Sequence, residues 1–321
     1  MRLRERVFLL AWTSMPSYLI TPLINCLRLL FRRGRQEHCV AASSTPDRAN
    51  DRVRSRCPPR LKIYWWRPAL GGFTNFGDEL GPLLVEQLFG LTYCWAPPET
   101  CDAIVIGSVL EKVCATRRES PPIVWGAGFI GDGRAVPLRS ITAAAVRGRF
   151  TAKRFGMEDS LVTGDPGLLC SRLLDRMPDK QYQAGLVLHY THDKFDVTSL
   201  FTGDVRNVCT IDVRMPPLEV IKKIAACETI FSTSLHGLVV ADSFGIPNQW
   251  IKLPRRLLGG DFKFYDYYSA FPGNAPQCRY LDGKSRWDVQ EAIVDIAQRY
   301  GRPGKDAVAN NLILSFQKCL L

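Results

Sequence analysis

A chain of 321 residues with 46% hydrophobic and 23% charged residues has enough apolar material for two cores, which excludes an intrinsically disordered protein. The net charge of +11 is concentrated at the N-terminus, where residues 1–60 carry twelve arginines and four acidic residues and leave only +3 for the other 261 residues. With no zinc-finger spacing and no alternation of aromatic and basic residues in the body, nucleic acid is not expected as a partner.

The first 35 residues are a basic, apolar leader. Residues 7–27 contain no charged side chain, are flanked by arginines on both sides, and are about long enough to span a bilayer. Pro16, Pro22 and scattered polar residues lower their hydrophobicity, so we expect peripheral membrane contact, with a spanning anchor or a disordered leader as alternatives. A cleaved signal peptide is disfavoured because no small-residue cleavage site precedes Arg28. Residues 36–60, rich in Ser, Pro, Asp and Arg, are expected to be a flexible linker.

The body begins with an expected strand at residues 61–66, followed by a helix over residues 79–89. Asn75, Gly77 and Asp78 lie between them. Asn75 and Asp78 are spaced like a helix N-cap and its acidic partner three residues later, and capping alone would explain both. The functional alternative gives Asp78 a proton-transfer or hydroxyl-orienting role, with Gly77 letting a ligand approach the backbone.

Two further buried parallel strands are expected at residues 102–108 and 122–125. The glycines at 126–131 match the dinucleotide-binding pattern formally, but a loop continues where the phosphate-binding helix should begin, which argues against a nicotinamide or flavin site. A strand ending at Val146 then leads into Arg147. The guanidinium N–H groups of Arg147 are well placed to bind a phosphate or carboxylate, although a surface arginine is the simpler alternative.

The second half alternates strands and helices again, which implies parallel strands joined by helical crossovers. We expect strands at 185–189, 207–212, 229–232 and 249–253, and helices at 217–227, 235–244 and 287–300. The aromatic residues at 261–268 are expected to pack against the edge of this domain, or alternatively to stack on a sugar ring.

The most informative stretch is the run from Ser232 to Gly237, between the strand at 229–232 and the helix at 235–244. Ligands of open parallel sheets bind at such strand-to-helix turns, and histidine is the side chain whose ordinary pKa lies nearest neutral pH. His236 is therefore a candidate acid or base. The structural alternative is a helix start at which Ser234 caps and His236 packs.

The histidines at 189 and 192 and the cysteines are the other side chains that could form a metal site or a disulfide. His189 and His192 with Asp193 could suggest a metal, but their rings would diverge at a strand end, so no metal is expected and His189 is placed in the substrate site. The eleven cysteines are scattered, odd in number and free of any Cys-x-x-Cys pair. They are expected to be free thiols in a reducing compartment.

Five motifs occur in a fixed order along residues 61–255. They are Asn75-Phe76-Gly77-Asp78, the Gly126 loop, Val146-Arg147-Gly148, Gly164-Asp165-Pro166, and Ser234-Leu235-His236-Gly237 followed by Gly245-Ile246-Pro247. This ordered set resembles the polysaccharide pyruvyl transferase family. Much of that family has an arginine at the position of Ser234, and the chain looks like the serine-bearing subgroup that acts on acidic exopolysaccharides such as succinoglycan.

The resemblance implies an α/β fold of two Rossmann-like domains facing a cleft, in a GT-B-like arrangement, here at residues 61–175 and 183–284 with a closing C-terminal helix at 285–321. It implies transfer of pyruvate from phosphoenolpyruvate to a sugar, as a ketal, with no cofactor. The acceptor is expected to be a lipid-linked oligosaccharide at the cytoplasmic face of the inner membrane.

In this chemistry His236 and Asp78 are the expected catalytic residues. Substrate-binding roles are expected for Asn75, Gly77, Arg147, Ser234 and His189. Two alternatives stay open: a GT-B-type glycosyltransferase that uses a nucleotide sugar, and a catalytically inactive carbohydrate-binding relative.

Overall fold

The computed structural model describes residues 60–68, 73–273, 276–282, 284 and 286–320. The leader predicted at 1–35 and nearly all of the linker predicted at 36–60 lie outside these residues. Residues 59–321 form one compact unit. Among the described residues, no helix combines the length and the apolar character needed to cross a membrane.

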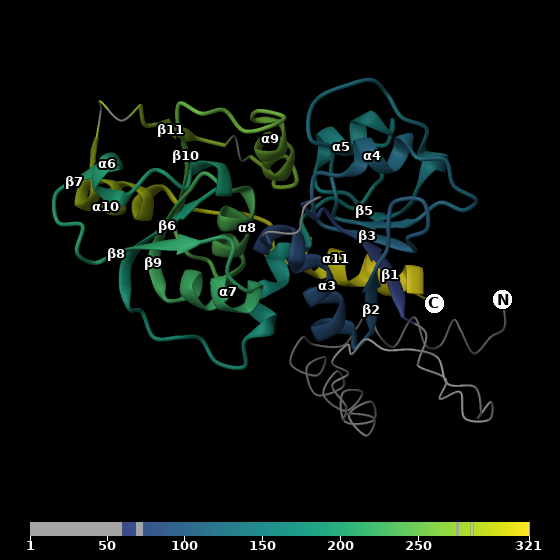
Figure 1. Cartoon of the computed structure of the whole chain (residues 1–321), viewed down its shortest axis with the longest axis horizontal. Coiled ribbons are helices and arrows are strands. Elements are labelled where there is room, and N and C mark those ends of the chain that lie inside the picture. Colours follow the sequence, from purple (N-terminus) through teal and green to yellow (C-terminus); the bar gives the residue numbers. More distant parts are fainter. Residues whose placement is uncertain (1–59, 69–72, 274–275, 283, 285, 321) are drawn as a thin grey trace, which may run out of the picture. The chain divides into compact units, whose positions relative to one another are not determined.

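The first half of the unit is built on a parallel sheet of five strands in the order β2-β1-β3-β4-β5 (Figure 1). Its strands are β1 (Leu61–Tyr64), β2 (Tyr93–Trp95), β3 (Ala103–Val105), β4 (Ile123–Trp125) and β5 (Thr142–Ala145). Its helical segments are α3 (Phe76–Phe89), α4 (Leu110–Ala115), η2 (Leu138–Ser140), α5 (Arg149–Arg154) and η3 (Pro166–Leu173). No helix follows β4 directly, in agreement with the expected loop after Gly126.

The second half contains another parallel five-stranded sheet, in the order β11-β10-β9-β6-β8. Its strands are β6 (Tyr182–Leu188), β8 (Val208–Asp212), β9 (Cys227–Ser232), β10 (Asn248–Lys252) and β11 (Cys278–Tyr280). The helical segments are η4 (Tyr190–His192), α6 (Val197–Leu200), α7 (Pro217–Ala225), α8 (Leu235–Ser243), α9 (Phe262–Tyr268) and α10 (Val289–Arg299). A short parallel pair joins β7 (Phe201–Thr202) to β12 (Trp287–Asp288).

The two sheets have the same topology. Counted in chain order within each half, the strands lie in the order 2-1-3-4-5, which is one of the two common doubly wound arrangements. The strand order reverses between β1 and β3 in the first sheet and between β6 and β9 in the second. These findings confirm an α/β fold with two Rossmann-like domains, although the sequence shows no internal repeat.

The central strands are buried on both faces, as parallel strands covered by helices must be, whereas the edge strand β11 is exposed. All three residues of β3 are buried, and so are five consecutive residues of β6 that end at Leu188. Helix α8 is apolar almost all round and packs against η3 and β9, so it lies inside the unit rather than on its surface. Because α8 is held on all sides, the first turn that carries His236 has a fixed position.

Two helices occupy the C-terminal segment, for which the sequence indicated a single closing helix. Helix α10 packs on the second sheet, as expected, whereas α11 (Lys305–Leu320) crosses back and packs against β4 and β5 (Figure 1). The Trp125 indole N–H donates to the Leu312 carbonyl at 2.8 Å, and the same ring stacks on Phe316 with centroids 4.5 Å apart. The C-terminal helix therefore completes the core of the first half.

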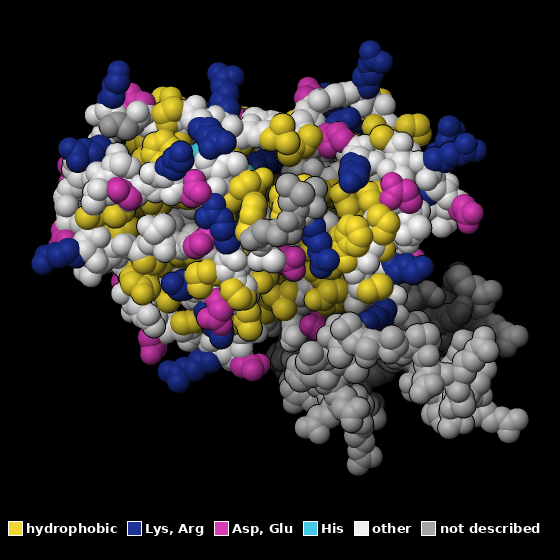
Figure 2. Space-filling model, viewed as in Figure 1, with side chains coloured by type: hydrophobic (Ala, Val, Ile, Leu, Met, Phe, Trp, Pro, Cys, Tyr) yellow, Lys and Arg dark blue, Asp and Glu magenta, His cyan; other side chains and the backbone are white. Residues whose placement is uncertain are grey.

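The aromatic residues at 261–268 form α9 and pack, as expected. Phe264 stacks on Trp250 with ring centroids 4.3 Å apart, and Tyr267 is fully buried. All eight cysteines among the described residues are free, which confirms the expected thiols for this part of the chain. On the face shown in Figure 2, lysine and arginine side chains stand apart from one another with acidic side chains between them.

Candidate active site

The predicted site residues fall at the points where the strand order of the two sheets reverses. Asn75, Gly77 and Asp78 follow β1 at the start of α3, while Ser234 and His236 follow β9 at the start of α8. His189 directly follows β6. Ligands of doubly wound sheets bind at these reversals. The residues predicted from the sequence therefore lie where this topology usually binds a ligand.

Gly77 and His236 bring the two halves into direct contact. A Cβ atom on residue 77 would overlap the Nδ1 atom of His236, so only glycine leaves room for the imidazole in this position. The neighbouring Phe76 fixes the approach: its amide donates to the Val213 carbonyl at 2.9 Å, and its ring meets the imidazole edge-on at 6.4 Å. Gly77 therefore serves close packing across the two domains.

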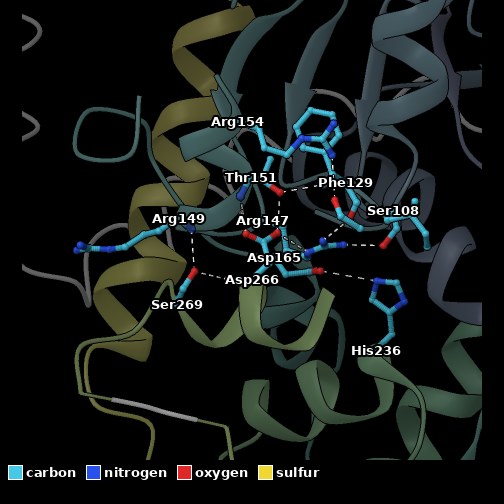
Figure 3. A network of polar contacts seen from close by, with 12 residues as sticks. Ser108, Phe129, Arg147, Arg149, Thr151, Arg154, Asp165, His236, Asp266 and Ser269 are labelled. Carbon is cyan, nitrogen blue, oxygen red and sulfur yellow. Dashed lines mark hydrogen bonds and ion pairs between the residues drawn. The ribbon is translucent and has the colours of Figure 1, made fainter. Parts of the chain in front are cut away.

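The other ring nitrogen of His236 faces a buried carboxylate. Nε2 lies 3.7 Å from Oδ2 of Asp165, and neither atom has a hydrogen-bond partner among the described residues (Figure 3). The second oxygen of Asp165 accepts the Gly167 amide at 2.9 Å, which caps η3. A histidine kept only for packing would have its buried nitrogen satisfied, so this geometry favours the functional interpretation.

Burial moves the pKa values of this pair in opposite directions. It raises the pKa of Asp165 to about 6, against the hydrogen bond from Gly167 and the charge of Arg147. It lowers the pKa of His236 to about 3, and the positive charges of Lys263 and Arg147 lower it further. At neutral pH the imidazole is therefore neutral, so the contact is not a charged pair.

Asn75 and Asp78 are paired with each other instead of capping α3. The Asn75 side chain makes no capping bond; its amide donates to Oδ2 of Asp78 at 2.7 Å. Asn75 is therefore the N-cap residue of α3 by position, but its side chain does not cap the helix. Burial raises the pKa of Asp78 to about 6, while the Asn75 hydrogen bond and the charge of Lys263 lower it and Glu79 raises it. Asp78 is thus a carboxylate that changes protonation near neutral pH.

The backbone opposite Asp78 is in an uncommon conformation. Ile106, which follows β3, has a φ of +65°, a value that a β-branched residue rarely adopts. The next residue, Gly107, has a φ of +96°, and a Cβ there would lie 3.3 Å from Oδ1 of Asp78. Such conformations cluster at functional sites, where the surrounding packing maintains them.

Arg147 is buried, which excludes the surface alternative. Its guanidinium donates to Asp266 Oδ2 at 2.9 Å, to Ser108 Oγ at 2.6 Å and to the Phe129 carbonyl at 2.6 Å (Figure 3). Asp266 also accepts the Thr151 hydroxyl at 2.7 Å. These bonds use three of the five N–H groups of the guanidinium, so Arg147 joins the ends of β3, β4 and β5 to α9 and places a positive charge beside Asp165.

His189 and Ser234 border this group. The His189 amide donates to the Thr233 hydroxyl at 2.8 Å, and its Nδ1 contacts the Thr191 hydroxyl at 2.9 Å. Burial, then the charge of Lys263, lowers the pKa of His189 to about 3. The structural alternative for Ser234 does not hold, because its side chain makes no capping bond; its backbone amide donates to Ser232 Oγ at 3.0 Å.

Two residues at the site were not assigned a role from the sequence. Asp165, within the Gly164-Asp165-Pro166 motif, caps η3 with one oxygen, while its other oxygen faces His236. Lys263 lies in the aromatic run at 261–268, and the sequence feature that could have pointed to it is a lysine among aromatic residues. Within the described ranges, no group of three or more His, Cys, Asp or Glu side chains is arranged to hold a metal ion.

Comparison with known proteins agrees with this geometry. A family model described as polysaccharide pyruvyl transferase matches residues 23–251. The chain is 30% identical over 208 residues to the uncharacterized protein L143 of Acanthamoeba polyphaga mimivirus, covering 61% of this chain and 71% of that protein. It is 28% identical over 218 residues to the succinoglycan biosynthesis protein ExoV of Rhizobium meliloti (strain 1021), covering 64% of each and thus less than two thirds of ExoV. No solved structure matches significantly. Because the family model covers more than half of the sequence, the chain belongs to the polysaccharide pyruvyl transferase family.

Proposed function

We propose that this protein transfers pyruvate from phosphoenolpyruvate to a sugar of a lipid-linked or cell-surface polysaccharide, forming a ketal. Family membership supports pyruvate transfer to a polysaccharide in general terms. The observation that carries the proposal is the meeting of Gly77 and His236, which brings the two strand-order reversals into one site with Asp78 on one side and Asp165 on the other.

The reaction has a definite proton balance. One sugar hydroxyl adds to C2 of the enol phosphate while C3 gains a proton and becomes a methyl group. The C2–O bond to phosphate then breaks, and a second hydroxyl bonds to C2 and closes the ketal. Two hydroxyl protons are released: one ends on C3, and the other leaves with phosphate or passes to solvent.

His236 and Asp78 divide this proton transfer between them. The neutral imidazole accepts a hydroxyl proton through Nδ1, the ring nitrogen that does not face Asp165, and delivers a proton to C3. Asp165 stabilises the imidazolium from the Nε2 side, for which the 3.7 Å separation must shorten when substrate binds. Asp78, held by Asn75, orients and deprotonates the second hydroxyl.

The donor carries a carboxylate and a phosphate, so the site must also bind anions. The N-terminus of α8, where Ser234 and His236 lie, is a favourable place for an anionic oxygen. Arg147 contributes a fixed positive charge next to Asp165, with two N–H groups left after its protein contacts. His189 borders the same region at the end of β6.

The cellular setting belongs to the same proposal. The basic leader at 1–35 would contact the membrane surface peripherally, with the enzyme at the cytoplasmic face of the inner membrane and the acceptor presented on a lipid carrier. Free thiols among the described cysteines support a reducing compartment.

Phosphate release from phosphoenolpyruvate by the full chain, with and without a lipid-linked oligosaccharide fraction, tests this function. Release that depends on acceptor and is absent in His236→Gln supports it. No release with any acceptor, combined with binding of a nucleotide sugar, would instead establish the glycosyltransferase alternative. Carbohydrate binding without either reaction would indicate the inactive relative.

A further inference from the structure

Lys263 is a buried cation without a counter-ion. Its side chain is only 9% exposed, and within the part of the chain that the structure describes it forms no hydrogen bond and no ion pair. Its recorded contact is with the Phe264 ring, whose centroid lies 5.4 Å from Nζ. The other deeply buried cations, Arg147 and Arg302, are each paired with an aspartate at 2.9 Å. An unpaired buried charge is unfavourable, so this exception requires a reason.

The position of Lys263 on α9 directs it toward the active site. Lys263 and Asp266 are three residues apart and so lie on the same side of the helix. Asp266 is bonded to Arg147 and to Thr151, and α9 packs against α5. The side of α9 that carries Lys263 therefore faces the end of the first sheet where Arg147 lies.

The electrostatics of the neighbouring groups agree with this orientation of Lys263. Its positive charge lowers the pKa values of Asp78, from the first domain, and of His236 and His189, from the second. Burial, with the charge of Arg147, lowers the pKa of Lys263 itself to about 8, while Asp78 raises it without approaching within ion-pair distance. Lys263 thus acts electrostatically on all three predicted site residues and, among the described residues, is hydrogen-bonded to none of them.

We propose that Lys263 binds an oxyanion of the donor, a carboxylate or phosphate oxygen, between Asp78 and His236. The inference rests on the proposed function and names a donor-binding residue that function requires. An ammonium is a compact charge with three donors, suited to a small anion that leaves at the end of each turnover. The loop from Ser232 to His236 supplies no fixed positive charge, so the cation comes from α9.

This role differs from a packing role in a measurable way. If Lys263 is an empty anion site, removing its charge relieves an unfavourable burial, and the free protein is as stable as before or more so. If it is structural, removing it lowers stability. Methionine keeps the length and apolar volume of the lysine stem and removes the charge, so Lys263→Met separates the two cases, and Lys263→Arg restores a cation.

The experiment uses the full chain and three probes: inorganic phosphate, pyruvate and phosphoenolpyruvate. Thermal unfolding and calorimetric binding are measured for the wild type, Lys263→Met, Lys263→Arg and the control Lys222→Met, an exposed lysine of α7 paired with Glu219. We expect the free Lys263→Met protein to unfold at the wild-type temperature or above. Its affinity for phosphoenolpyruvate should fall about 10- to 100-fold, as for loss of one hydrogen bond to a charged group. Lys263→Arg should recover part of that affinity, and the control should match the wild type.

The probes identify the anion and separate this inference from the proposed function. Selective loss of phosphate binding assigns Lys263 to the phosphate, and selective loss of pyruvate binding assigns it to the carboxylate. Unchanged affinity with a lower unfolding temperature overturns the inference, as does a wild type that binds none of the three probes. Pyruvate transfer by Lys263→Met with an unchanged KM for phosphoenolpyruvate overturns it while the function stands. Lys263-dependent phosphate binding in a protein that transfers no pyruvate leaves the inference standing and refutes the function.

Discussion

Nε2 of His236 lies 3.7 Å from Oδ2 of Asp165, and both atoms are buried without a hydrogen-bond partner in the described part of the chain. The two residues come from different halves of the sequence, one from the Gly-Asp-Pro turn and one from the first turn of α8. An aspartate behind a catalytic histidine fixes the tautomer and stabilises the imidazolium that forms during proton transfer. The pairing therefore predicts that Asp165 acts through His236.

Asp165→Asn tests that relationship because asparagine can still accept the Gly167 amide and cap η3. We expect kcat to fall at least about 100-fold, since the amide cannot balance an imidazolium, with little change in KM for the donor. Steady-state kinetics with circular dichroism as a folding check measures this. An unchanged kcat would limit Asp165 to its capping role.

The same substitution predicts a pH dependence of stability. The pKa of Asp165 is raised to about 6 from 3.8, so the native state holds its proton more tightly than the unfolded state does. Its stabilising contribution is present below pH 3.8 and is lost as the pH rises to about 6, a difference of about 3 kcal/mol for a fully buried group. Relative to the wild type, Asp165→Asn should therefore gain stability between pH 4 and pH 7. Urea unfolding at the two pH values measures the gain, and a constant difference would contradict the raised pKa.

Gly77→Ala should displace the imidazole. The new methyl group overlaps a side chain rather than backbone, so the ring can move and the fold should survive. A misplaced base predicts a loss of activity of about 100-fold with a change of less than about 2 kcal/mol in the free energy of unfolding. Gly301→Ala is the matched control, because a Cβ there has no neighbour within 4 Å and its φ is ordinary. Equal activity in the two variants would remove Gly77 from the site.

Asn75→Ala should move the acidic limb of the pH–rate profile to higher pH. The Asn75 amide stabilises the charged form of Asp78, and its loss raises the pKa of that carboxyl above about 6. Asp78→Asn should instead lower kcat/KM about 100-fold or more across the pH range. A limb that stays in place in Asn75→Ala would show that Asp78 does not set it.

Arg147 and Asp266 should couple strongly in stability. Arg147→Met leaves a buried carboxylate without its 2.9 Å partner and should destabilise the fold by about 3–5 kcal/mol. Adding Asp266→Asn removes that charge, so the double variant should lose less than the sum of the two single losses. Chemical unfolding of the four proteins measures the coupling, and simple additivity would mean that the pair is not a unit.

The fold was largely predictable because most strands of both sheets are short apolar runs bounded by glycine, proline or polar residues. The sequence located β6, β9 and α8 to within a few residues, and α8 stood out because it is apolar on every side. The return of α11 to the first sheet was not predictable, since it depends on contacts such as Trp125 with Leu312, 187 residues apart. Local spacing carries no information about such a contact.

The site was predictable only in part, for a related reason. His236, Gly77 and Asp78 stand at strand-to-helix turns, which the pattern of strands and helices reveals. Asp165 has a complete local explanation as a cap, and that explanation hides its second oxygen. Lys263 becomes notable only when burial and the lack of a partner are known together. For Asn75 the sequence spacing also fits a cap, and only the structure shows that its side chain bonds Asp78 instead.

In the proposed reaction His236 transfers protons while pyruvate moves from phosphoenolpyruvate to a sugar. Carbon-13 NMR of the polysaccharide acceptor after incubation with phosphoenolpyruvate labelled at C2 tests this most directly. We expect a labelled quaternary ketal carbon on the acceptor with the wild type and none with a folded His236→Gln variant. An unlabelled acceptor with the wild type, or equal labelling by the two proteins, would contradict it.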